Sequence, residues 1–142
     1  MILYDSKLAP NPRRVRIFLA EKGIEVPVRQ VDLASRESRA PAFLGKNPLG
    51  AVPVLELDDG TCISESVAIC RYFEELQPEP PLFGTDARDR ALVEMWNRRM
   101  EFELFRNVSG TFQHTHEFFQ GRIEQIPAWG EVCRKTARER LA

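Results

Sequence analysis

The first half of the chain alternates between short apolar runs and longer blocks with a helical period. Residues 2–4, 26–31 and 54–57 are short runs rich in β-formers, which predicts three strands. The third run is followed by Asp-Asp-Gly at residues 58–60, and Asp-Gly supplies the positive φ angles of a tight turn. We therefore expect a hairpin whose second arm includes residues 62–63.

Two longer helices are expected between and after these strands. Residues 12–22 and 66–76 each have apolar positions that recur on one helical face. These positions are Val15, Phe18 and Leu19 in the first helix and Val67, Ile69, Cys70 and Phe73 in the second. Asn11 suits the cap of the first helix, Pro12 its first position and Gly23 its end.

The order of these elements predicts the fold of the first half. A short helix at residues 41–46 lies between the second and third strands. The resulting order, βαβαββα, is that of a thioredoxin-like α/β domain. We assign residues 1–77 to this domain.

A proline-rich segment separates the two halves. Three of the ten prolines fall within residues 78–81, where neither a helix nor a central strand tolerates them, so residues 78–85 are predicted to be a linker. Residues 86–142 have a helical pattern, with Asp86 as a cap and Pro127 at the start of a last helix. This second part is predicted to be all-α and incomplete.

Charge and composition narrow the class of protein. The chain has 20 Lys and Arg against 21 Asp and Glu, a balance that favours neither nucleic acid nor an anionic membrane as a partner. No apolar run approaches the roughly 20 residues of a membrane span, and the first residues do not resemble a signal peptide. The three cysteines, Cys62, Cys70 and Cys133, lack metal-ligand spacing, and their odd number favours a reducing compartment. We predict a cytoplasmic protein that binds no metal.

Pro53, at the entry to a strand, marks the first candidate binding element. If the Val52–Pro53 peptide bond is cis, the backbone N–H and C=O of Val52 are free to pair with an extended peptide. The alternative is a proline that only begins an edge strand.

Glu65 and Ser66 stand where a helix is expected to begin. A helix N-terminus offers unpaired N–H groups and the positive end of its dipole, and the Ser66 hydroxyl is a further donor, so this position suits a small carboxylate. The Glu65 carboxylate suits an ammonium group. Together they fit an amino-acid head group such as the γ-glutamyl end of glutathione. Alternatively, Ser66 only caps its helix.

These two elements together resemble the glutathione-site motifs of soluble, bacterial-type glutathione S-transferases. The resemblance rests on residues 47–55, Asn-Pro-Leu-Gly-Ala-Val-Pro-Val-Leu, and on residues 64–72. It includes residues 14–24 of the first helix and extends to residues 94–101, which resemble the first helix of the family's α-helical domain. It implies a thioredoxin-like domain, an all-α domain and glutathione as co-substrate.

The resemblance implies six glutathione-binding residues. They are Val52, Pro53, Glu65, Ser66, Arg39 and Lys46. The backbone of Val52 would pair with the cysteinyl unit beside Pro53. The acidic residue and the serine would hold the γ-glutamyl end, and the two basic side chains would meet the glycyl carboxylate.

The resemblance does not identify the residue that activates the glutathione thiol. A thiol with a pKa of about 8.5 is only a few per cent ionised at pH 7, so catalysis needs a group that stabilises the thiolate. Ala9 stands where the family carries Ser or Cys, and its side chain donates no hydrogen bond. Ala9-Pro10-Asn11 resembles the Thr-Pro-Asn stretch of some relatives, which makes Asn11 the main candidate. Ser6 is a second candidate, and we expect Tyr4 to be structural.

The predicted function is that of a glutathione transferase that adds the glutathione thiol to a hydrophobic electrophile, as in detoxification. A reductase is not expected, because position 9 holds no cysteine for a mixed disulfide. The resemblance also implies a homodimer. The alternative function is a non-catalytic glutathione S-transferase-like module that binds a protein partner, which Ala9, Ala51 and the short second domain favour.

Overall fold

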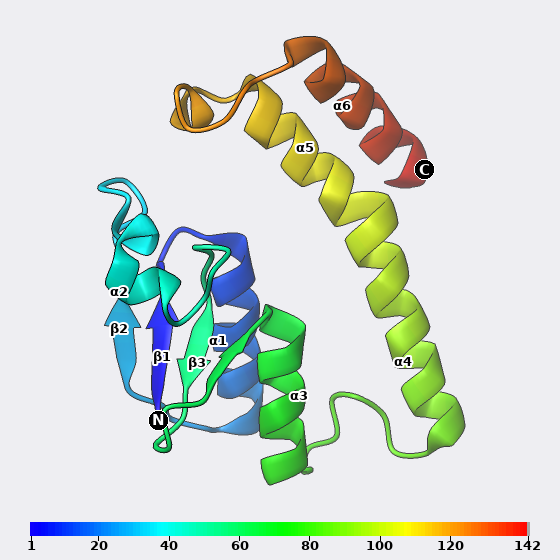
Figure 1. Ribbon diagram of the computed structural model, residues 1–142. Coiled ribbons are helices and arrows are strands. Elements are labelled where there is room, and N and C mark those ends of the chain that lie inside the picture. Colours follow the sequence, from blue (N-terminus) through cyan, green and yellow to red (C-terminus); the bar gives the residue numbers. More distant parts are fainter. Residues whose placement is uncertain (142) are drawn as a thin grey trace. The chain divides into compact units, whose positions relative to one another are not determined.

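The computed structural model describes residues 1–141 and contains two compact units (Figure 1). The first unit comprises Met1–Leu82, and the second begins at Phe83. The division falls inside the segment predicted to be a linker. Residue 142, the last of the predicted helical domain, lies outside the described residues.

A four-stranded mixed sheet with the strand order β2-β1-β3-β4 forms the centre of the first unit. The strands are Ile2–Asp5 (β1), Val28–Gln30 (β2), Val54–Glu56 (β3) and Cys62–Ser64 (β4). β1 runs parallel to β2 and antiparallel to β3, and β3 and β4 form the predicted hairpin. Because Val54 pairs with Ser64, the residues just before β3 lie beside those just after β4.

Three α-helices pack on this sheet (Figure 1). They are Pro10–Lys22 (α1), Pro41–Leu44 (α2) and Ser66–Leu76 (α3). Phe43 of α2 joins Tyr4 and Val54 in a core on one face of the sheet. Successive strand residues point to opposite faces, so Leu3 and Leu55, both fully buried, belong to the other face. The predicted apolar stripe of α1 is confirmed, because Val15, Phe18 and Leu19 are all buried.

The start of α1 differs from its prediction. The helix begins at Pro10, and Ala9 with φ −79° and ψ 138° occupies the capping position, so the prediction that Asn11 caps α1 is wrong. Proline lacks an N–H, and the first turn of a helix needs none, so Pro10 and Pro12 both fit there. Asn11 is therefore the second helical residue. Its side chain is left for other contacts.

The length of β2 and the cap of α3 also differ from what the sequence suggests. β2 covers only Val28–Gln30 rather than residues 26–31, and its late start follows from Pro27, which has no N–H for a ladder. α3 begins at Ser66 as predicted, with Glu65 at the capping position, but no side chain caps it. The alternative role of Ser66 as a capping side chain is therefore wrong.

The second unit is helical. Its elements are Ala87–Arg99 (α4), a π-helical turn at Met100–Phe105, Arg106–Thr115 (α5), a 3-10 turn at Glu117–Phe119, and Pro127–Leu141 (α6). Asp86 caps α4 as predicted, since its carboxylate accepts a hydrogen bond of 2.9 Å from the N–H of Asp89. α6 packs closely on α5, because a Cβ at Gly130 would lie 2.6 Å from Cγ2 of Thr115. Within residues 1–141, no helix combines the length and apolar character needed to cross a bilayer.

Candidate functional site

An unpaired stretch of backbone precedes β3. Ladder pairing of β3 begins at Val54, and within residues 1–141 no hydrogen bond reaches the N–H or C=O of Val52. The Val52–Pro53 peptide bond is cis. The side chain of Val52 is buried in the core under α2, which fixes the backbone in place. This edge has the donor and acceptor that an extended ligand needs for main-chain pairing.

Asn47 shapes the loop that leads to this edge. Its side chain is 3% exposed, and its Nδ2 donates to the carbonyl of Ala51 at 2.8 Å. Its Oδ1 accepts from the N–H of Leu49 at 3.1 Å. Both functions of one buried amide are therefore used to fix residues 47–51. Asn47 belongs to the motif at residues 47–55, but the sequence pattern predicts no role for its side chain.

Gly50 in the same loop has no room for a side chain. Its φ is +59°, and a Cβ there would lie 2.8 Å from the carbonyl oxygen of Ser38. Gly50→Ala is therefore expected to destabilise the protein by about 2–3 kcal/mol, from left-handed strain and from the clash. It is also expected to weaken glutathione binding, because the loop must move. Urea unfolding and glutathione titration measure the two effects.

Gly23→Ala is the matched control for this prediction. Gly23 has φ +65°, but a Cβ added there would meet no atom within 4 Å. This control is expected to cost about 1 kcal/mol and to leave glutathione binding unchanged. If both variants lose the same stability and the same glutathione affinity, the tight packing of Gly50 against the Ser38 carbonyl is not the cause.

Arg14 joins the first turns of α1 and α3. Its Nη1 donates to Oγ of Ser66 at 2.5 Å and to Oδ1 of Asn11 at 3.4 Å. Ser66 is 5% exposed, whereas Glu65 beside it is exposed and has φ 70°. Arg14 is not among the residues predicted from the sequence. Its position three residues after Asn11, on the same helical face, was the available signal.

The electrostatics of this place favour an anion. The N-termini of α1 and α3 both present positive dipole ends, and the Arg14 guanidinium adds a full positive charge. Cys70, one turn into α3, supplies no thiolate. Burial raises the pKa of its thiol from 9.0 to about 12, and the charge of Arg14 offsets this only in part.

The two basic candidates for the glycyl carboxylate lie in different surroundings. Arg39 lies beside the binding loop and donates from Nη1 to the carbonyl of Leu49 at 3.1 Å. Lys46 instead donates to Oε2 of Glu56 at 2.7 Å. The same oxygen accepts from the hydroxyl of Tyr4 at 2.6 Å. Lys46 and Tyr4 thus share one acidic partner, away from the residues that Arg14 brings together.

The Lys46–Glu56 pair makes the stability of the fold depend on pH. The hydrogen bond from Lys46, followed by that from Tyr4, lowers the pKa of Glu56 below its ordinary 4.5. The hydrogen bond to Glu56 raises the pKa of Lys46 above 10.5, partly offset by desolvation. A carboxyl group whose pKa is lowered by folding stabilises the folded state at pH values above its ordinary pKa. An ammonium group whose pKa is raised by folding stabilises it at pH values below its ordinary pKa. The pair therefore contributes between about pH 4.5 and 10.5.

Glu56→Gln tests this window. The Tm is expected to fall by a few degrees at most at pH 7, because solvent still reaches both side chains, which are 26% and 25% exposed, and screens the pair. The difference from the unchanged protein is expected to shrink as the pH falls below 4.5, where Glu56 itself becomes protonated. Thermal melts at pH 3.5, 5 and 7 measure it. A difference that stays constant over this range would exclude the ionic contribution.

The loop with Ser6 and Ala9 is fixed by a buried carboxylate at the end of β1. Asp5 is 1% exposed, and its two oxygens accept from Nη1 of Arg16 and Nε2 of Gln30, each at 2.5 Å. Arg16 also donates to the carbonyl of Lys7 at 2.9 Å. Ser6 is partly exposed and lies in this loop. Nothing in the sequence pattern distinguished Asp5 from a surface charge.

Comparisons with known proteins give one consistent result. The model of the glutathione S-transferase N-terminal domain matches residues 9–76. Glutathione S-transferase 2 of Saccharomyces cerevisiae is 42% identical over 134 residues, which cover 92% of this chain and 58% of that relative. The chain therefore spans little more than half the length of this curated relative.

Solved structures agree in fold and sequence. A glutathione S-transferase domain-containing protein from Marinobacter aquaeolei has a TM-score of 0.93 and 40% identity, over 99% of this chain and 71% of that one. The crystal structure of Gtt2 from Saccharomyces cerevisiae has a TM-score of 0.92 and 39% identity, over 99% and 70%. Similarity of this extent covers the thioredoxin-like unit and the helical unit alike. The chain belongs to the glutathione S-transferase family.

Proposed function

We propose that this chain is a glutathione transferase, which activates the glutathione thiol for addition to an electrophilic small molecule. The observation that carries the proposal is the unpaired backbone of Val52 next to the N-terminus of α3, where Arg14 bonds to Ser66. The similarity to a relative named glutathione S-transferase 2 supports it.

Each part of glutathione finds a matching group in this arrangement. The backbone of Val52, beside Pro53, pairs with the cysteinyl unit. Ser66 and Arg14 bind the γ-glutamyl carboxylate at the N-terminus of α3, and Glu65 binds the γ-glutamyl ammonium. Arg39 is favoured over Lys46 for the glycyl carboxylate, because Lys46 is engaged by Glu56.

The reaction needs the thiol proton to leave for solvent and the thiolate to remain. Asn11 and the N-terminus of α1 stabilise this thiolate, with Ser6 as the alternative donor. Lowering a thiol pKa by two units takes about 2.7 kcal/mol, which a hydrogen bond and a helix dipole together supply. The sulfur then forms a bond to the electrophilic carbon, whose leaving group or π bond accepts the electron pair.

We also propose that the protein is a cytoplasmic homodimer that takes part in detoxification. The dimer is supported by the exposed apolar side chains of α4, such as Leu92 and Trp96. A hydrophobic electrophile is supported by aromatic side chains of the second unit, such as Phe102 and Phe112, which are half exposed.

Titration of glutathione into the purified protein tests the function. Bound thiolate is followed by its ultraviolet absorbance between pH 5 and 9. A bound-thiol pKa well below 8.5 is expected. Binding with an unshifted thiol pKa would overturn the transferase and favour a binding module. Absence of binding would overturn the assignment of Val52, Glu65 and Ser66 as the site.

A further inference from the structure

A closed ring of hydrogen bonds joins the end of β1 to the loop that precedes α1. Asp5 ends β1 and is 1% exposed, and its carboxylate accepts from Nη1 of Arg16 and from Nε2 of Gln30. The same two side chains also hold the backbone of Lys7. Oε1 of Gln30 accepts from the N–H of Lys7 at 3.0 Å, and Nη2 of Arg16 donates to the carbonyl of Lys7 at 2.9 Å. Both main-chain groups of Lys7 therefore depend on side chains that meet at one buried carboxylate.

The ring closes only with a carboxylate at position 5. An ionised carboxylate accepts hydrogen bonds and donates none, so Gln30 turns its NH₂ group toward Asp5 and its carbonyl oxygen toward Lys7. An asparagine in place of Asp5 would bring a donor of its own. If this donor faces Arg16, two donors meet. If it faces Gln30, the Gln30 amide has to turn over, and its NH₂ group then meets the N–H of Lys7. Asp5→Asn therefore breaks one link in either orientation, although it keeps the shape of the side chain.

The ring determines where α1 begins. Arg16 lies in the second turn of α1, so its two hydrogen bonds hold this helix to the end of β1. The loop between them is closed by the N–H of Ala9, which donates to the carbonyl of Ser6 at 3.0 Å. Of the first three residues of α1 only Asn11 carries an N–H, because the other two are prolines. The start of α1 thus has few donors, and their position depends on the ring.

We propose that Asp5 is a positioning residue for the glutathione thiol, because it fixes the loop and the helix start that face this thiol. The proposal rests on the proposed function, in which Asn11 and the N-terminus of α1 stabilise the thiolate. Asp5 does not touch the ligand, since it is 1% exposed and both of its oxygens are used within the protein. A displacement of about 1 Å in a supporting element can weaken such an aligned contact up to roughly 100-fold. All of these residues belong to the first unit.

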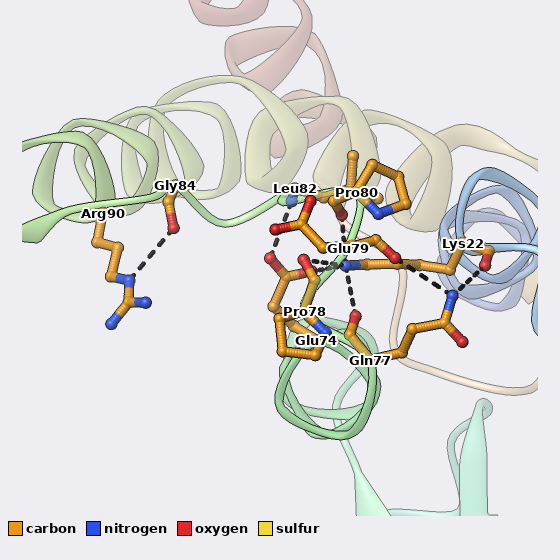
Figure 2. Close-up of polar contacts among 9 residues, drawn as sticks. All are labelled: Lys22, Glu74, Gln77, Pro78, Glu79, Pro80, Leu82, Gly84 and Arg90. Carbon is orange, nitrogen blue, oxygen red and sulfur yellow. Dashed lines mark hydrogen bonds and ion pairs between the residues drawn. The ribbon is translucent and has the colours of Figure 1, made fainter.

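A second buried ion pair, at the opposite end of α1, supplies the matched control (Figure 2). The Lys22 side chain is fully buried, and its Nζ lies 2.5 Å from Oε2 of Glu74 in α3. The same Nζ donates to three backbone carbonyls within residues 77–80. At about 1.5 Å per residue along α1, Lys22 lies about 16 Å from Asn11. Loss of this pair loosens the same helix without acting on its start.

The experiment compares Asp5→Asn and Gln30→Met with the control Lys22→Met/Glu74→Gln. Gln30 is exposed, so Gln30→Met opens the ring with little effect on the core and decides the question if Asp5→Asn does not fold. The control replaces both partners, because a buried carboxylate left without its cation would be strongly destabilising. Three quantities are measured for each variant. They are the pKa of the bound glutathione thiol from its ultraviolet absorbance, the Kd of γ-glutamylalanylglycine, which lacks the thiol, and hydrogen exchange of the Lys7 amide.

The two ring variants are expected to change only the thiol end of the site. Bound thiolate is expected to titrate about one pH unit higher in Asp5→Asn and about half a unit higher in Gln30→Met. Removal of the Asp5 charge by itself would lower the thiol pKa, so a rise reports a change of position. The Kd of γ-glutamylalanylglycine is expected to stay within about twofold, because its contacts lie in other segments. Exchange at Lys7 is expected to become faster. The control is expected to lower the Tm and to leave the thiol pKa unchanged.

Three results would overturn the positioning role while the proposed function stands. Faster exchange at Lys7 with an unchanged thiol pKa in the two ring variants would leave the ring a merely structural role. An equal rise of the thiol pKa in the control would trace the effect to general loosening of α1. A loss of γ-glutamylalanylglycine affinity as large as the effect on the thiol would place the damage outside the thiol end. If the unchanged protein binds glutathione with a thiol pKa of about 8.5, the proposed function fails, and this inference fails with it.

Discussion

Replacement of Arg14 by methionine is expected to weaken glutathione binding about 30-fold. Arg14 lies against Oγ of Ser66 at 2.5 Å, at the N-terminus of α3 where the γ-glutamyl carboxylate is proposed to bind. A hydrogen bond to a charged group contributes about 1.5–3 kcal/mol, which corresponds to a loss of roughly 10- to 150-fold. Calorimetric titration of glutathione into the variant measures the effect.

Arg13→Met is the matched control for this prediction. Arg13 is the preceding residue of α1, is exposed, and its side chain has no polar partner within residues 1–141. The control removes the same charge from the same helix and is expected to change the glutathione Kd by less than about twofold, because exposed charges are screened. Equal losses in both variants would reduce the role of Arg14 to general attraction of an anion.

A double variant that combines Arg14→Met with Ser66→Ala tests whether these two side chains bind the same group of the ligand. If Arg14 and Ser66 hold the same carboxylate, the loss in the double variant is expected to be smaller than the sum of the two single losses in free energy. Strict additivity would place them on different parts of glutathione.

The backbone geometry of the candidate site could be predicted from the sequence, because it is encoded locally. Val52, Pro53 and Ser66 lie in short motifs whose strand entry and helix start follow from residue type. The antiparallel β3–β4 hairpin then places these two motifs side by side. Its turn was also readable, since Gly60 has the positive φ that Asp-Gly predicts.

The side-chain part could not be predicted in the same way, because it depends on contacts between distant segments. Arg14 and Ser66 are 52 positions apart, as are Tyr4 and Glu56. A period of two or 3.6 shows which face a side chain occupies but not which polar partner it meets there. The wrong cap at Asn11 has a local cause, since two prolines both fit the first turn of α1.

Replacement of Asn11 by alanine is expected to lower kcat about 100-fold while the glutathione Kd changes by less than about threefold. Oδ1 of Asn11 accepts from Arg14 at 3.4 Å, so its Nδ2 is the group left to donate to the thiolate at the start of α1. The removal of one donor aimed at a developing charge typically costs roughly 10²–10³ in kcat. The proposed binding contacts at Val52 and Ser66 are untouched, so affinity is expected to be retained.

The pKa of the bound thiol decides whether this loss is electrostatic. If Asn11 stabilises the thiolate, the absorbance of bound thiolate is expected to titrate about one to two pH units higher in Asn11→Ala. Ser6→Ala and Tyr4→Phe are the controls, and both are expected to keep kcat within about threefold, because Ser6 lies in the preceding loop and the Tyr4 hydroxyl donates to Glu56 at 2.6 Å. A loss confined to Ser6→Ala would transfer the role to that hydroxyl. If kcat and the thiol pKa are unchanged in all three variants, the thiolate is held by the positive dipole end of α1 and the backbone N–H of Asn11 alone, since Pro10 and Pro12 have no N–H.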